Sequence, residues 1–82
     1  MNPETQQLSD RAPLAKILTV SDSVATGRGV DGSGPALSER LASSGYTVTE
    51  LRVSADGRAL VASALKEMTR DFGGLILTTG GT

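Results

Sequence analysis

The sequence contains neither cysteine nor histidine among its 82 residues. Without cysteine, disulfide bonds, thiolate metal sites and cysteine catalysis are excluded. Without histidine, imidazole catalysis and most zinc chemistry are excluded as well. Aromatic residues are also scarce, because only Tyr46 and Phe72 are present. The core is therefore predicted to be built from aliphatic side chains.

The sequence also lacks an excess of either charge and any long hydrophobic run. Eight Lys and Arg residues stand against nine Asp and Glu residues, so the formal net charge is -1. Without a basic excess, we expect no large interface with nucleic acid or with an anionic membrane. No apolar run approaches the roughly 20 residues that a membrane span needs, and residues 1–12 lack the apolar segment of a secretory signal. A cytoplasmic protein is therefore expected.

Hydrophobic patterning predicts alternating strands and helices after a polar start. Residues 1–14 are predicted to form a flexible tail, and the domain is expected to occupy residues 15–82. Residues 22–34 contain four glycines and almost no apolar period, which is typical of a loop. The regular elements are predicted as strands at 16–21, 46–53 and 75–79 and as helices at 35–44 and 58–71.

This order of elements predicts an α/β fold with a mostly parallel, Rossmann-like sheet between two helical layers. Right-handed crossovers on both sides of the first strand produce the spatial order 2-1-3. The carboxyl ends of the first and third strands then meet, and ligands bind at such a reversal of strand order. No helix follows the third strand, so we expect that the sequence is the first part of a larger domain. Alone, it is expected to fold poorly.

A glycine turn closes the third predicted strand and is a candidate phosphate-binding segment. It consists of Thr78, Thr79, Gly80, Gly81 and Thr82. Paired glycines let the backbone approach a ligand closely and direct N–H groups at an anion. An ordinary tight turn explains the same residues equally well.

Two aspartates are expected on the same rim of the sheet. Asp22 follows the first strand between Ser21 and Ser23, and it could hold Mg²⁺ or a ribose hydroxyl or simply order the loop. Asp56 follows the second strand, at or near the N-cap position of the second helix. From spacing alone the capping role of Asp56 is favoured, but two carboxylates facing a phosphate-binding turn would also suit a Mg²⁺-nucleotide reaction.

The segment from Gly27 to Gly32 matches the pattern G-x-G-x-x-G. A dinucleotide-binding fingerprint runs directly from a strand into a helix, whereas Gly27 lies six residues beyond Ser21. We therefore interpret this segment as a loop. Its Arg28 could close over a phosphate or remain solvated.

Together, three segments resemble one known family. I-L-T-V-S-D-S with the downstream Gly29 and S-G-P, then Asp56 before a helix, then L-I-L-T-T-G-G-T, resemble the MogA/MoaB family of molybdenum-cofactor biosynthesis proteins. The resemblance covers residues 16–82, which correspond to about the first half of the family's domain.

The resemblance implies a molybdopterin adenylyltransferase that assembles as a homotrimer. Such enzymes transfer AMP from Mg·ATP to the terminal phosphate of molybdopterin and release pyrophosphate. Asp56 then matches the family's catalytic aspartate, and Asp22 lies in the loop that matches the family's pocket-lining loop. Asp56 and Asp22 are the candidate Mg²⁺ ligands among these residues. Molybdopterin or nucleotide binding is implied for Ser21, Asp22, Ser23, Thr78, Thr79, Gly80, Gly81 and Thr82.

The family pattern is incomplete in these 82 residues, because the family's second metal-binding aspartate and its later asparagine-rich loop have no counterpart. We therefore expect these residues alone to be inactive. Three alternatives remain open: a molybdopterin-binding module without adenylyl transfer, a domain of the related MoeA or CinA type, and a small dinucleotide-binding domain.

Overall fold

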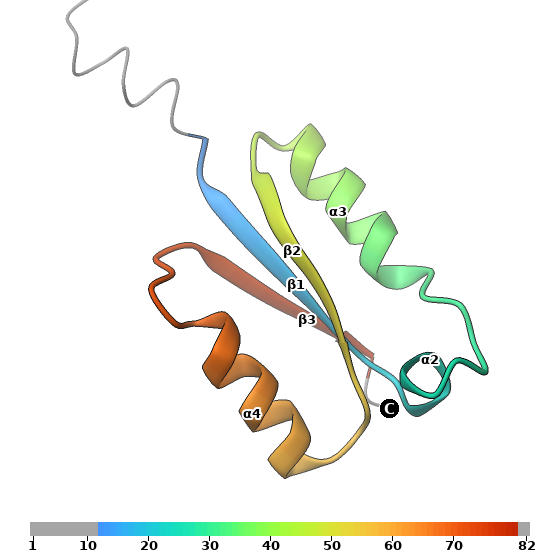
Figure 1. Cartoon of the computed structure of the whole chain (residues 1–82). Helices are drawn as coiled ribbons and strands as arrows, with labels where there is room; N and C mark the ends of the chain where they lie inside the picture. Colours follow the sequence, from blue (N-terminus) through green and yellow to red (C-terminus); the bar gives the residue numbers. More distant parts are fainter. Residues whose placement is uncertain (1–11, 81–82) are drawn as a thin grey trace, which may run out of the picture.

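The structure is a computed structural model that describes residues 12–80. Its elements are β1 (Leu14–Val20), α2 (Asp22–Ala25), α3 (Ser33–Ser43), β2 (Thr47–Ser54), α4 (Arg58–Met68) and β3 (Leu75–Gly80) (Figure 1). Strand β1 begins at Leu14, two residues before its predicted start. Most of the predicted flexible tail lies outside the described residues and stays a prediction.

The three strands form one parallel sheet in the order β2-β1-β3, as predicted. In the central strand, Ile17 lies opposite Leu51 of β2 and Leu77 of β3. Helices α3 and α4 cover opposite faces of this sheet (Figure 1). The small Rossmann-like α/β fold expected from the sequence is thereby confirmed.

Two aliphatic clusters, one on each face of the sheet, form the core. Successive side chains of β1 point to opposite faces, as the strand period of two requires. Ile17 packs with Leu41 of α3 on one face, and Leu18 packs with Met68 of α4 on the other. Ile17, Leu18 and Met68 are completely buried. The central strand thus supplies both halves of the core.

Helix α3 begins earlier than the sequence predicted. Its N-cap residue is Gly32 and its first residue is Ser33, so the predicted start at residue 35 is wrong by two residues. The cause is Asp31, whose Oδ1 accepts a hydrogen bond of 2.9 Å from the Gly34 N–H and stabilises the first turn. The predicted stop at Gly45 is confirmed, because this glycine adopts a left-handed φ of 95° directly after the helix.

Helix α4 ends at Met68, three residues before its predicted end. Asp71 adopts a left-handed φ of 52°, which a continuing α-helix does not allow. Phe72 therefore belongs to the following turn, although its spacing matches the apolar stripe of the helix. Its ring lies 4.3 Å from Lys16 Nζ, so the aromatic side chain covers this cation.

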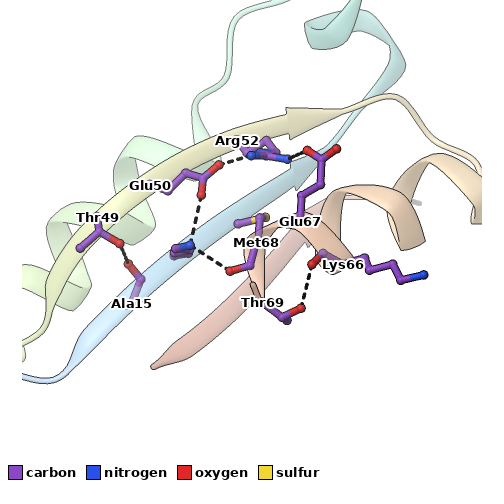
Figure 2. A network of polar contacts seen from close by, with 9 residues as sticks. Ala15, Thr49, Glu50, Arg52, Lys66, Glu67, Met68 and Thr69 are labelled. Atoms are coloured by element: carbon purple, nitrogen blue, oxygen red, sulfur yellow. Dashed lines mark hydrogen bonds and ion pairs between the residues drawn. The ribbon is translucent and has the colours of Figure 1, made fainter. Parts of the chain in front are cut away.

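A polar network ties the C-terminal end of α4 to β1 and β2 (Figure 2). Lys16 Nζ donates to the Met68 carbonyl at 2.9 Å and pairs with Glu50 at 3.5 Å. Arg52 bridges Glu67 and Glu50, each at 2.6 Å. The bond to Glu67, followed by the bond to Glu50, raises the pKa of the Arg52 guanidinium. Arg52 therefore stays charged throughout the physiological pH range.

No helix within residues 12–80 is long and apolar enough to span a bilayer.

Candidate functional site

A cavity of about 550 Å³ opens at the carboxyl ends of the strands. The ends of β1 and β3 lie together beside α2 in Figure 1, which is the arrangement expected for the strand order 2-1-3. The residues that line the cavity come from the ends of β1 and β3, from the segment between β1 and the start of α3, and from the loop after β2: Thr19, Val20, Ser21, Asp22, Ser23, Val24, Arg28, Val30, Asp31, Gly32, Ser33, Asp56 and Gly80.

The segment after β1 is helical, so its prediction as a continuous loop is wrong. Helix α2 is a single turn, and the Ser21 hydroxyl caps it by accepting from the Val24 N–H at 3.4 Å. The Ser21 and Ser23 hydroxyl oxygens lie 3.2 Å apart. Four residues are too few for a hydrophobic period, and only the Ser-Asp start indicates this helix.

The two predicted aspartates come together on the cavity wall. Asp22 Oδ1 accepts a hydrogen bond of 2.8 Å from the Asp56 N–H, which joins the loop after β1 to the loop after β2. Both aspartates line the cavity and both side chains are exposed. This contact spans 34 residues of sequence. The sequence predicted a shared rim, and the structure shows direct contact.

Asp56 does not cap helix α4. The N-cap residue is Gly57, with a φ of 145°, and no side chain bonds to the first turn. The capping interpretation favoured by spacing is therefore wrong. Gly57 takes this position with a positive φ, which favours glycine, and Asp56 lines the cavity one residue before it.

The glycine turn reaches the cavity through Gly80. Gly80 lines the cavity with a φ of 89°, and a Cβ there would collide with the Val20 carbonyl. Thr78 and Thr79 lie two residues and one residue earlier on β3, opposite Leu18 and Thr19, and neither lines the cavity. Gly81 and Thr82 lie outside the described residues, so their predicted binding role stays a prediction.

Asp31 is a cavity residue that the sequence analysis missed. Its Oδ2 accepts a hydrogen bond of 3.0 Å from the hydroxyl of Thr19, which is buried on β1. Its Oδ1 accepts from the Gly34 N–H, so both carboxylate oxygens have partners. An aspartate just before a helix start is a capping signal, and this signal could have identified the contact with Gly34 but not the contact with Thr19.

The loop after α2 is not a dinucleotide fingerprint. Its Arg28 and Gly29 N–H groups both donate to the Ser23 carbonyl, at 2.8 and 2.9 Å, and fold the loop back onto α2. Gly32 caps α3 and has open space around its Cβ position, so it does not pack a helix against the sheet. The interpretation of this segment as a loop agrees with the structure.

The carboxylates around the cavity suit a hydrated cation that shares its ligands with a substrate. Asp22 retains Oδ2, and Asp56 retains both carboxylate oxygens, without a hydrogen-bond partner among residues 12–80. Residues 12–80 contain no group of three or more His, Cys, Asp or Glu that could enclose a metal ion. Mg²⁺ commonly binds one or two carboxylates together with waters and substrate phosphates, so the donor set fits Mg²⁺.

Comparison with known proteins identifies relatives of this chain. The profile of one protein family, described as "Probable molybdopterin binding domain", matches residues 16–82. A curated relative from Synechococcus elongatus (strain ATCC 33912 / PCC 7942 / FACHB-805), the "Molybdenum cofactor biosynthesis bifunctional protein", is 37% identical over 69 residues. The alignment covers 84% of this chain but only 22% of that relative. No solved structure matches the chain at a comparable level of significance.

Proposed function

The chain belongs to the family described as "Probable molybdopterin binding domain", and from this premise we propose that its cavity binds molybdopterin and Mg·ATP for adenylyl transfer. The observation that carries the proposal is the contact between Asp22 and Asp56 at 2.8 Å on the cavity wall. It joins the Asp22 carboxylate to the backbone N–H of Asp56, so two aspartates from different strand ends meet at the place where parallel α/β sheets bind ligands. The same aspartates are the ones that the resemblance to MogA and MoaB assigns to the site.

In the proposed reaction, an oxygen of the terminal molybdopterin phosphate attacks the α-phosphorus of ATP. The bond between the α-phosphorus and the bridging oxygen breaks, and pyrophosphate leaves with that bond's electron pair. Catalysis of such in-line displacements rests on positioning and charge neutralisation rather than on a protein nucleophile. The absence of histidine and cysteine is therefore compatible with the reaction.

Each side chain has a distinct part in this proposal. Asp22 and Asp56 would hold Mg²⁺, which neutralises phosphate charge when bound. Ser21 and Ser23 flank Asp22 in the sequence and line the same cavity, and Gly80 lets the backbone of β3 approach the ligand. Thr78 and Thr79 directly precede Gly80 on β3. The resemblance also implies a homotrimer, and the sequence pattern suggested a cytoplasmic location; both stay predictions.

Replacement of Asp56 by asparagine tests the proposal in the full gene product. We expect Mg·ATP-dependent pyrophosphate release with molybdopterin to fall at least about 100-fold, because charge at the metal is lost. The free energy of unfolding should change by less than about 0.5 kcal/mol, because the Asp56 side chain is exposed. EDTA should abolish release by the unaltered protein.

Glu39→Gln is the matched control, because it also removes one carboxylate from an exposed position outside the cavity. It should leave turnover unchanged. If the unaltered protein binds molybdopterin but releases no pyrophosphate, the proposal of adenylyl transfer fails. The alternative of a molybdopterin-binding module without this reaction is then supported.

A further inference from the structure

We propose that Arg28 is the cationic contact for a phosphate group of the ligand in this cavity, an inference that rests on the proposed function. Arg28 is the one Lys or Arg side chain that lines the cavity within residues 12–80. The other charged groups on the wall are the carboxylates of Asp22, Asp31 and Asp56. A ligand that carries phosphate groups needs positive charge there, and Arg28 is the protein group that supplies it.

The Arg28 side chain is oriented before any ligand arrives. Its Nε donates to the Thr26 hydroxyl at 3.0 Å, and that hydroxyl in turn lies 2.9 Å from the Asp22 carbonyl oxygen. The Arg28 N–H also donates to the Ser23 carbonyl. The backbone and the guanidinium of Arg28 are therefore both held by hydrogen bonds to α2 and its C-cap residue Thr26, next to Asp22. Such prior orientation reduces the entropy lost on binding.

The remaining donors of Arg28 are available. A guanidinium has five N–H donors, and only the Nε group has a partner among the described residues. Arg28 forms no ion pair within that part of the chain. Asp31, the carboxylate nearest in sequence, directs its oxygens to Thr19 and Gly34 instead. The two terminal nitrogens of Arg28 are thus left to bind phosphate oxygens in the bidentate manner typical of arginine.

The close fit of the loop fixes this arrangement. A Cβ at Gly29 would approach the Ser23 Oγ to 2.9 Å, so the residue next to Arg28 lies directly against α2. Gly27, on the other side, has a φ of 81° that favours glycine. These glycines therefore serve to hold Arg28 at the cavity rather than to form a dinucleotide fingerprint.

Binding of inorganic pyrophosphate in the presence of Mg²⁺, measured by calorimetry on the full gene product, tests the inference. We expect Arg28→Gln to raise the Kd for pyrophosphate at least about tenfold, as loss of charge-assisted hydrogen bonds does. Arg28→Lys should recover part of the affinity, because it restores the charge without the bidentate geometry. Arg40→Gln is the matched control, since Arg40 is exposed on α3 outside the cavity, and it should leave the Kd unchanged.

Two outcomes would overturn the inference: pyrophosphate that binds Arg28→Gln as tightly as the unaltered protein, or equal weakening by Arg40→Gln. If Arg28→Gln does weaken pyrophosphate binding, the Kd values of this variant for Mg·ATP and for molybdopterin identify which ligand carries the phosphate that Arg28 binds. A rise for Mg·ATP alone assigns Arg28 to the nucleotide, and a rise for molybdopterin alone assigns it to the pterin phosphate. If Arg28 controls pyrophosphate binding while no adenylyl transfer occurs, only the proposed function fails.

Discussion

Gly80 links the backbone of β3 to the wall of the cavity. Its φ of 89° and the position of the Val20 carbonyl leave no room for a side chain. We expect Gly80→Ala to lower the free energy of unfolding of the full gene product by about 2 kcal/mol or more, because it adds left-handed strain to a backbone collision. Urea titration measures this loss, and ligand affinity should fall as the strand end shifts.

Gly73→Ala provides the control for this substitution. Gly73 has no left-handed φ, and no atom lies within 4 Å of the position that its Cβ would occupy. The free energy of unfolding of the Gly73→Ala variant should differ from that of the unaltered protein by less than about 0.5 kcal/mol. Equal stability of the two variants would show that Gly80 tolerates a side chain and that the cavity rim is adaptable.

The position of a single residue could be predicted where that residue directly follows a strand. Asp22 and Asp56 were placed on one rim because parallel strands end at a common edge. Their direct hydrogen bond was not predictable, since it depends on the turn at Gly57. Asp31 was missed because a glycine-rich segment has no periodicity that would show which of its polar groups faces the sheet. Its partner Thr19 was read only as part of a strand.

At the scale of elements, the start of α3 depends on Asp31. Its Oδ1 accepts from the Gly34 N–H and its Oδ2 accepts from buried Thr19, so Asp31 joins the helix start to β1. We expect Asp31→Ala to cost about 1–2 kcal/mol of unfolding free energy, as loss of a helix cap does. Asp31→Asn should cost less, because an amide oxygen can still accept from Gly34. Thermal and urea unfolding would measure both values.

Glu39→Ala, in the exposed middle of α3, controls for changes in helix composition. The free energy of unfolding of Glu39→Ala should stay within about 0.5 kcal/mol of that of the unaltered protein. If Asp31→Ala were equally mild, the helix start would be stabilised by its backbone alone. The role assigned to Asp31 would then be wrong.

The long elements were predicted well and their ends were not. The predicted helices at 35–44 and 58–71 exist as α3 and α4, and Leu37 and Leu41, four residues apart, form the face of α3 that packs on the sheet. Phe72 extended the apolar spacing of α4 beyond the real end of that helix, because a turn residue can make the same apolar contact as a helical one. The polar network that joins Glu50, Arg52 and Glu67 in Figure 2 was not predicted, since it depends on how α4 lies across two strands.

At the scale of the molecule, strand order was the most predictable feature. Right-handed crossovers leave few arrangements for three parallel strands, and the observed order β2-β1-β3 is the expected one. Which apolar side chains are buried could be predicted less well from the sequence. Leu51 and Val53 of β2 are 50% and 37% exposed, although their alternation resembles that of a covered strand. Which side chains a helix covers depends on its position over the sheet, and a sequence pattern does not specify that position.

This distribution of buried and exposed side chains leads to a prediction about residues 1–82 as an isolated polypeptide. Only six hydrophobic side chains within residues 12–80 are buried, while Leu14, Leu51 and Leu60 are each more than 40% exposed. A core of this size rarely supplies more than about 3–5 kcal/mol, so we expect broad, weakly cooperative urea unfolding and a tendency to associate. Circular dichroism with sedimentation measures both properties. A sharp transition of a monomer with an unfolding free energy above about 5 kcal/mol would contradict this expectation, because such stability would require better packing than the two aliphatic clusters provide.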